Sequence, residues 1–161
     1  METSTTIIGL GLVLITILPI IFLLRNQHIN ASKIETILKQ YNQENAKAFT
    51  IRENINNKVL ALDERNKKFV LIDLNTKPEV VTFADLKEIG HCEIHRKIEQ
   101  SQTSTKKELI TKVEVVLEKK SDKTKIPIKF YDFEYEKPIQ ITLFRHDQLA
   151  EKWLDIIKKA I

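Results

Sequence analysis

The feature that most constrains this 161-residue chain is a run of eighteen residues without a charge, from Ile7 to Leu24. Fourteen of the eighteen are Leu, Ile, Val or Phe. Because a helix rises about 1.5 Å per residue, the run is roughly 27 Å long, close to the ~30 Å hydrocarbon core of a bilayer. The run therefore predicts one transmembrane helix, mildly kinked at Pro19 because proline removes a helical hydrogen bond.

Two other interpretations of this run stay open, a cleaved secretory signal and a buried core helix. The six residues before the run contain Glu2 but no Lys or Arg, and no small-residue cleavage site follows Leu24. Both features are unlike a secretory signal. A core helix is usually apolar on one face, whereas this run is apolar all round. A retained membrane anchor is the interpretation that these observations favour.

The distribution of charge predicts how the anchor is oriented. All 26 Lys and Arg residues lie at or after Arg25, and the positive-inside rule places such a segment in the cytoplasm. Residues 1–6 are then a short extracytoplasmic tail of a single-pass protein of the cell (inner) membrane. The single cysteine, Cys92, agrees with a cytoplasmic location because it cannot form a disulfide within the chain.

The remainder, residues 25–161, is long enough for one domain with its own core. It carries a net charge of +5, since all 26 basic residues and 21 of the 22 acidic ones fall there. This mild excess can favour an anionic lipid surface, or it can simply be solvated. Basic and acidic residues alternate without a long basic stripe, so we expect no nucleic-acid partner.

Residues 25–50 are expected to form an amphipathic linker, helical over residues 30–49. Ser32 and Glu35 have the spacing of a capping box, which predicts the start of the helix. The apolar face of this helix can pack on the domain, pair with a second copy or lie on the membrane. Its residues are the candidate partner-binding residues: Ile34, Ile37, Leu38 and Tyr41.

Residues 51–161 are expected to form the domain, because short apolar runs separated by turn residues indicate antiparallel strands. The polar stretch 99–107 predicts a flexible loop. The expected strands are residues 59–62, 69–74, 80–83, 89–98, 109–117, 126–133 and 139–144.

A closing amphipathic helix is expected from Asp147, which is a plausible N-cap residue. Its apolar residues recur every four positions at Leu149, Trp153, Ile157 and Ile161. We expect Trp153 to be a core residue, because a large aromatic side chain on such a face gains most from burial.

From about residue 59 onward, the chain resembles the pleckstrin-homology-like (PH-like) fold of small bacterial membrane-anchored proteins. Residues 61–71 are similar to the opening hairpin of such domains, and residues 82–89 to the stretch that leads into the next strand. Residues 150–160 are similar to their closing helix, whose Trp covers an open end of the barrel. The resemblance implies an α+β class: an N-terminal transmembrane helix, then a mostly antiparallel, partly open β barrel closed by a C-terminal amphipathic helix.

Relatives of this fold bind phosphoinositides, peptides or no known ligand, so the fold alone does not choose a function. Lipid-binding members use basic residues around the first hairpin. The Lys-rich spacing of those members, ending in a strand Arg, is absent here, which argues against a specific inositol-lipid site. The candidate lipid-facing residues lie in two turns: Arg65, Lys67, Lys68, Lys119, Lys120 and Lys123.

Residues 91–95 contain the only cluster of residues typical of catalytic or metal sites. On a strand, His91, Glu93 and His95 share one face while Cys92 and Ile94 share the other. Two strand residues four apart are about 13 Å from each other, too far for one metal ion without strong bending. Cys92 is expected to be a buried, inert thiol rather than a nucleophile paired with His. We therefore predict no catalytic residue, metal ion or cofactor.

The function expected from the sequence is a non-catalytic, membrane-anchored PH-like module that binds or scaffolds a protein partner at the cytoplasmic membrane face. Homo-oligomerisation stays open. The alternative is peripheral sensing of anionic lipid by the basic turns. A third hypothesis, a metal-dependent enzyme using His91 and His95, has the least support.

Overall fold

The computed structural model describes residues 17, 30–43, 45–100, 108–134 and 140–161. By their contacts, the residues form two compact units, 1–46 and 47–161. Apart from Ile17, the apolar run 7–24 lies outside the described residues. Among the residues that are described, no helix is both long and apolar enough to cross a membrane.

The first unit contains a helix over residues 30–41, shorter than the expected 30–49. Ser32 lies inside this helix, where its carbonyl accepts a hydrogen bond from Thr36 Oγ1 at 2.9 Å, so the capping box predicted there is wrong. The helix ends where the apolar residues stop. Gln43 follows it with a positive φ of 48°, a backbone conformation that cannot continue a helix.

A short 3-10 turn lies at the boundary of the two units in the sequence, and the second unit continues with a four-stranded antiparallel sheet in the order β1-β2-β3-β4. The first strand was not expected, so the hairpin around residues 64–67 joins the second and third strands rather than the first two. The elements are η1 (Ala46–Ala48), β1 (Ile51–Ile55), β2 (Lys58–Asp63), β3 (Lys68–Asp73) and β4 (Val80–Asp85).

Strands β2 and β3 are the centre of this sheet and are buried on both faces. Leu60 and Leu71, on one face, belong to the main hydrophobic core. Val59 and Ile72 point to the other face and are also buried. This arrangement explains why both strands are near-continuous apolar runs in the sequence rather than alternating ones.

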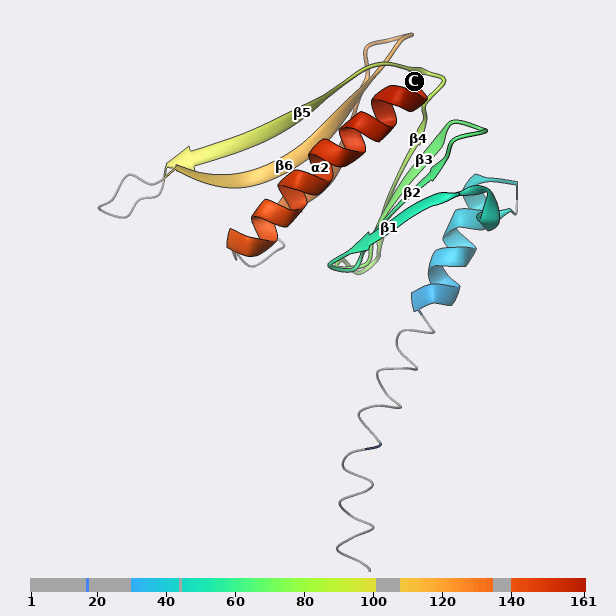
Figure 1. Cartoon of the computed structure of the whole chain (residues 1–161), viewed down its shortest axis with the longest axis horizontal. Coiled ribbons are helices and arrows are strands. Elements are labelled where there is room, and N and C mark those ends of the chain that lie inside the picture. Colours follow the sequence, from blue (N-terminus) through green and yellow to red (C-terminus); the bar gives the residue numbers. More distant parts are fainter. Residues whose placement is uncertain (1–16, 18–29, 44, 101–107, 135–139) are drawn as a thin grey trace, which may run out of the picture. The chain divides into compact units, whose positions relative to one another are not determined.

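A second, three-stranded antiparallel sheet follows, with β6 in the centre and β5 and β7 at its edges. Its strands are β5 (Ile89–Gln100), β6 (Glu108–Lys119) and β7 (Lys125–Asp132). Strands β5 and β6 form a long curved ribbon (Figure 1). The polar loop expected at residues 99–107 is shorter than predicted, because β5 continues through Gln100; residues 101–107 lie outside the description.

The chain closes with a single long helix, α2 (Gln140–Ala160). Two predictions are corrected here: residues 140–144 are helical rather than a last strand, and Asp147 lies inside the helix rather than capping it. The apolar period of four expected at the sequence level is confirmed, because Leu149, Trp153 and Ile157 are all buried. Helix α2 packs on the inner face of the three-stranded sheet, contacting β5, β6 and β7.

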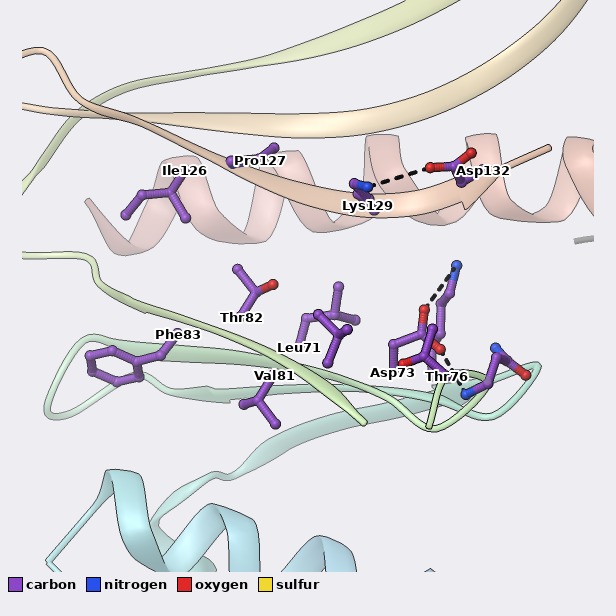
Figure 2. A pocket seen from close by; sticks show the side chains of 13 residues that line it. Leu71, Asp73, Thr76, Val81, Thr82, Phe83, Ile126, Pro127, Lys129 and Asp132 are labelled. Carbon is purple, nitrogen blue, oxygen red and sulfur yellow. Dashed lines mark hydrogen bonds and ion pairs between the residues drawn. The ribbon is translucent and has the colours of Figure 1, made fainter. Parts of the chain in front are cut away.

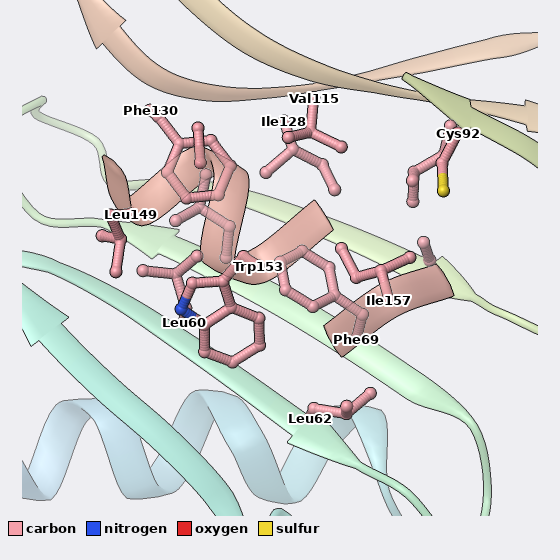
Figure 3. Packing of buried hydrophobic residues seen from close by; sticks show 14 of the residues in the cluster. Leu60, Leu62, Phe69, Cys92, Val115, Ile128, Phe130, Leu149, Trp153 and Ile157 are labelled. Atoms are coloured by element: carbon pink, nitrogen blue, oxygen red, sulfur yellow. The ribbon is translucent and has the colours of Figure 1, made fainter. Parts of the chain in front are cut away.

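The main core fills the space between the two sheets and α2, as Figure 3 shows. The indole of Trp153 is fully buried and meets the Phe69 ring edge-on, with centroids 5.6 Å apart and planes at 65°. The architecture is therefore α+β with a C-terminal helix, as expected, and its strands form two separate antiparallel sheets.

Candidate functional site

A groove of about 540 Å³ lies in the second unit between the edge strands β4 and β7. Leu71, from the neighbouring strand β3, lines it at depth and is only 3% exposed. In Figure 2, Thr82 of β4 and Ile126 of β7 project into the space between the two strands. A hollow of this size is within the roughly 300–1,000 Å³ range of ligand sites.

Most side chains along the middle of the groove are apolar. This lining comes from β3, β4 and β7, and the two edge strands do not pair with each other, because β4 pairs only with β3 and β7 only with β6. The groove is therefore an open seam between two sheets. Its apolar lining residues are Leu71, Val80, Val81, Phe83, Ile126 and Pro127.

Pro127 limits the backbone hydrogen bonds that the free edge of β7 can donate into the groove. The Lys119 N–H donates to Thr124 O at 3.0 Å, and hydrogen-bonded and non-hydrogen-bonded pairs alternate along antiparallel strands. Lys119 and Thr124 therefore form a hydrogen-bonded pair. Counting three pairs along the register from there leads to Val116↔Pro127, which is a non-hydrogen-bonded pair. The nitrogen of Pro127 therefore faces the groove, where it has no hydrogen to donate to an added strand.

One end of the groove is polar and balanced in charge. Lys129 lies 3.5 Å from Asp132, and the Lys129 side chain is half exposed. Thr76 lines the same end, and its buried Oγ1 makes no hydrogen bond with any described residue. Two opposite charges side by side favour a polar group that is neutral overall.

Lys58 also lines the polar end, and its side chain is 3% exposed. Its ammonium donates to the carbonyl of Phe130 at 2.9 Å and lies 3.8 Å from the Asp73 carboxylate. A buried charge is stable only with such partners. Lys58 thus joins the four-stranded sheet to β7 and holds one end of the seam at a fixed width.

The four candidate partner-binding residues lie on the helix over residues 30–41. Leu38 is fully buried, whereas Ile34, Ile37 and Tyr41 are each partly exposed. The structure therefore places them on one helix with three apolar side chains within reach of solvent.

The six candidate lipid-facing residues lie in the β2–β3 and β6–β7 turns or at the strand ends beside them, and several already bind acceptors. Lys67 Nζ donates to the carbonyl of Ile161 at 3.1 Å, and Lys120 Nζ to the carbonyl of Lys87 at 3.1 Å. Lys119 and Lys123 form ion pairs with Glu88 and Glu118, and Lys68 also has a partner. Arg65 is exposed. These contacts compete with binding to a lipid headgroup.

The row His91–Glu93–His95 lies on the exposed face of β5, as expected from strand alternation. His95 Nε2 is 2.8 Å from Glu93 Oε1, and His91 Nε2 is 3.8 Å from Glu93 Oε2. The hydrogen bond from His95 is the main reason that the pKa of Glu93 is lowered. Both imidazoles thus turn toward one carboxylate. Within the described residues, no group of three His, Cys, Asp or Glu side chains is placed to hold a metal ion.

Cys92 lies on the opposite face of β5 and is buried, as predicted. Burial raises the pKa of its thiol, and the positive charge of Lys158 opposes that shift only in part. The thiol is thus protonated at neutral pH and makes a poor nucleophile.

Sequence reasoning did not find the groove, because its walls come from strands more than forty residues apart. One signal for it exists in the sequence. A proline inside an otherwise apolar strand, as at Pro127, indicates an edge strand whose nitrogen faces away from its neighbour.

Comparison with known proteins finds no similarity: no family model, curated protein or solved structure matches this chain.

Proposed function

We propose that this protein is a single-pass, membrane-anchored, non-catalytic module of PH-like fold that binds a protein partner at the cytoplasmic membrane face. Residues 7–24 are the anchor in this proposal, the helix over residues 30–41 offers the contact surface, and residues 47–161 are the PH-like domain. Anchoring confines the domain to a thin layer beside the membrane. A weak contact with another membrane protein then has a high effective concentration.

The observation that carries the proposal is the order of elements in the second unit. Four antiparallel strands, three antiparallel strands and a closing helix with a buried Trp follow one another along the chain. This is the order expected of a PH-like domain, a fold that serves many binding functions. The reactive side chains support a non-catalytic role, because Cys92 is buried and Glu93 is held between two imidazoles.

The exposed part of the helix over residues 30–41 supports a protein as the partner. Ile37 is only partly buried, and Ile34 and Tyr41 flank it on the same side of the helix. Partly exposed apolar residues at helical spacing are the kind of surface that another helix can cover.

The proposal is tested by purifying the full-length protein from gently solubilised membranes and identifying the proteins that remain bound. The variant Ile37→Glu places a charge on the proposed contact, and Gln40→Glu places the same charge on an exposed position of the same helix. We expect a stoichiometric membrane protein with the wild type and with Gln40→Glu, and its loss with Ile37→Glu.

Two outcomes would contradict the proposal. One is a wild-type protein that purifies from membranes without any companion. The other is recovery of the protein in the soluble fraction without detergent, which would remove the anchor. The fluorescence of Trp153, the only tryptophan, shows whether Ile37→Glu keeps the folded core.

A further inference from the structure

We infer that the groove between β4 and β7 binds a single hydrocarbon chain of a lipid-like amphiphile, with the polar headgroup at Lys129 and Asp132. This goes beyond the proposed function, because it gives the domain a lipid ligand at a place distinct from the 30–41 helix. It relies on the proposed anchor only for a supply of lipid nearby.

The shape and lining of the groove support a hydrocarbon occupant. Leu71 lines it as a buried side chain, and Ile126 and Thr82 project into the space between β7 and β4 (Figure 2). Apolar surface of this kind gains about 25 cal/mol for each Å² removed from water. Val80, at one end of the seam, is 52% exposed, an unusual exposure for a large aliphatic side chain.

An added peptide strand is the other occupant to consider, since β4 and β7 are both edge strands. A peptide at this seam would need backbone hydrogen bonds from β7 on one side. Pro127 stands in the middle of that edge with its nitrogen toward the groove, so the central donor is missing. A hydrocarbon chain needs no backbone donor, and Pro127 contributes apolar surface to it instead.

The polar end favours a headgroup with no net charge. Lys129 and Asp132 offer one positive and one negative group side by side, and Asp73 is already paired with the buried Lys58. A zwitterionic headgroup can replace this 3.5 Å ion pair with two others, its phosphate on Lys129 and its ammonium on Asp132, whereas a purely anionic headgroup would meet Asp132. Phosphatidylethanolamine and its single-chain derivative have the required combination of charges.

The inference is tested on the full chain in lipid nanodiscs made of phosphatidylethanolamine and phosphatidylglycerol. A phosphatidylethanolamine that carries a diazirine in its acyl chain is included and activated by light, and its attachment sites are mapped by mass spectrometry. We expect two separate groups of labelled residues. One lies in the anchor, at residues 7–24, and the other lies on β4 and β7 around residues 80–83 and 126–129.

The variant Thr82→Trp fills the groove and should reduce labelling of β4 and β7 by roughly tenfold, while leaving the anchor label unchanged. Asn54→Trp is the matched control, because Asn54 is an exposed position of another edge strand, β1. It should leave both labels unchanged. Far-UV circular dichroism checks that both variants fold. The wild-type map tests the inference by itself if Thr82→Trp does not fold.

The outcomes separate this inference from the proposed function. Label in residues 7–24 alone overturns the lipid groove and leaves the anchor in place. Label on β4 and β7 alone supports the groove and contradicts the anchor, and no label at either place contradicts both. A photoreactive residue at position 82 that captures a protein instead of lipid overturns the inference in favour of a peptide occupant.

Discussion

At the scale of single residues, Glu53 joins β1 to the closing helix through its carboxylate. Its carboxylate accepts a hydrogen bond from Trp153 Nε1 at 3.0 Å and contacts Lys152 Nζ at 2.8 Å. The indole N–H is the one polar group of a side chain that is otherwise fully buried. Without Glu53 it would lose its acceptor, which is costly for a buried donor.

We expect Glu53→Ala to lower the free energy of unfolding by about 1–3 kcal/mol, because it leaves the Trp153 N–H without an acceptor. Denaturant unfolding followed by Trp153 fluorescence measures the change. Glu64→Ala, an exposed glutamate in the β2–β3 turn, is the control and should change it by less than about 0.5 kcal/mol. Equal effects of the two variants would disprove the role of Glu53.

Cys92 gives a second prediction at this scale, because burial raises the pKa of its thiol. The folded chain should react with a maleimide at least roughly tenfold more slowly than the unfolded chain, since less thiolate is present and access is limited. The raised pKa also means that stability falls as pH rises through the thiol pKa of the unfolded state. Cys92→Ala, which has no other thiol, gives the background. Reaction at the same rate in both states would refute this prediction.

The His95–Glu93 contact predicts a pKa change at one carboxyl. The pKa of Glu93 is lowered chiefly by the hydrogen bond from His95, with a smaller contribution from the charge of His91. His95→Ala should therefore raise the pKa of Glu93 toward its ordinary value more than His91→Ala does. Any stabilisation by this contact is therefore present above the ordinary pKa of an unfolded glutamate. It is lost as the pH falls through the lowered pKa of Glu93 in the folded protein. Titration of the Glu93 carboxyl carbon by NMR in the wild type and both variants measures these pKa values. Equal pKa changes in His95→Ala and His91→Ala would contradict the prediction.

At the scale of elements, tight turns determine which strands can pair. The β1–β2 turn places Asn56 and Asn57 at φ values of 45° and 61°. Two consecutive residues in this region make the type of turn that matches the twist of a hairpin, and Asn tolerates it better than most residues. This turn explains why residues 51–55 form a strand that pairs with β2. In the sequence, the only signs of that strand are its alternating residues and the two asparagines that follow it.

We expect Asn57→Val to lower the free energy of unfolding by about 1–2 kcal/mol, because a β-branched residue is strained at positive φ. Asn57→Gly is the matched variant and should be close to neutral, since glycine adopts this region freely. The unfolding midpoint in urea provides the comparison. If both variants unfold at the same midpoint, the backbone conformation is not what selects Asn57.

The helix α2 shows how an element can be recognised while its start is misplaced. The apolar period of four after residue 149 predicted its buried face correctly. Its first two turns contain Phe144, which is 62% exposed, so no apolar pattern marks them as helical. Asp147, expected to cap the helix, instead accepts a hydrogen bond from Arg96 of β5 at 2.7 Å. Asp147 therefore forms an ion pair with a distant strand instead of capping the helix N-terminus.

At the scale of the whole second unit, one core joins both sheets to α2. Phe69 of β3 and Trp153 of α2 are in contact, and residues of the three-stranded sheet belong to the same buried cluster. The two sheets should therefore unfold together rather than separately.

We expect Phe69→Ala to lower the free energy of unfolding by about 3–5 kcal/mol, because it leaves a cavity beside Trp153. Amide hydrogen exchange should then speed up in both sheets alike. Leu62 and Leu117, one from each sheet and both fully buried, are convenient reporters. Loss of protection in the four-stranded sheet alone would show that the two sheets are separate folding units.

Sequence patterns were enough to predict the α+β class, the closing helix, the burial of Trp153 and Cys92, and six of the seven strands among the described residues. These features follow from local rules, since hydrophobic period and turn residues act over a few positions. The start of α2, the partners of the basic turn residues and the groove between β4 and β7 could be found only from the folded structure. Those features depend on residues far apart in the chain, such as Lys58 and Phe130, and their contacts exist only once the core has formed.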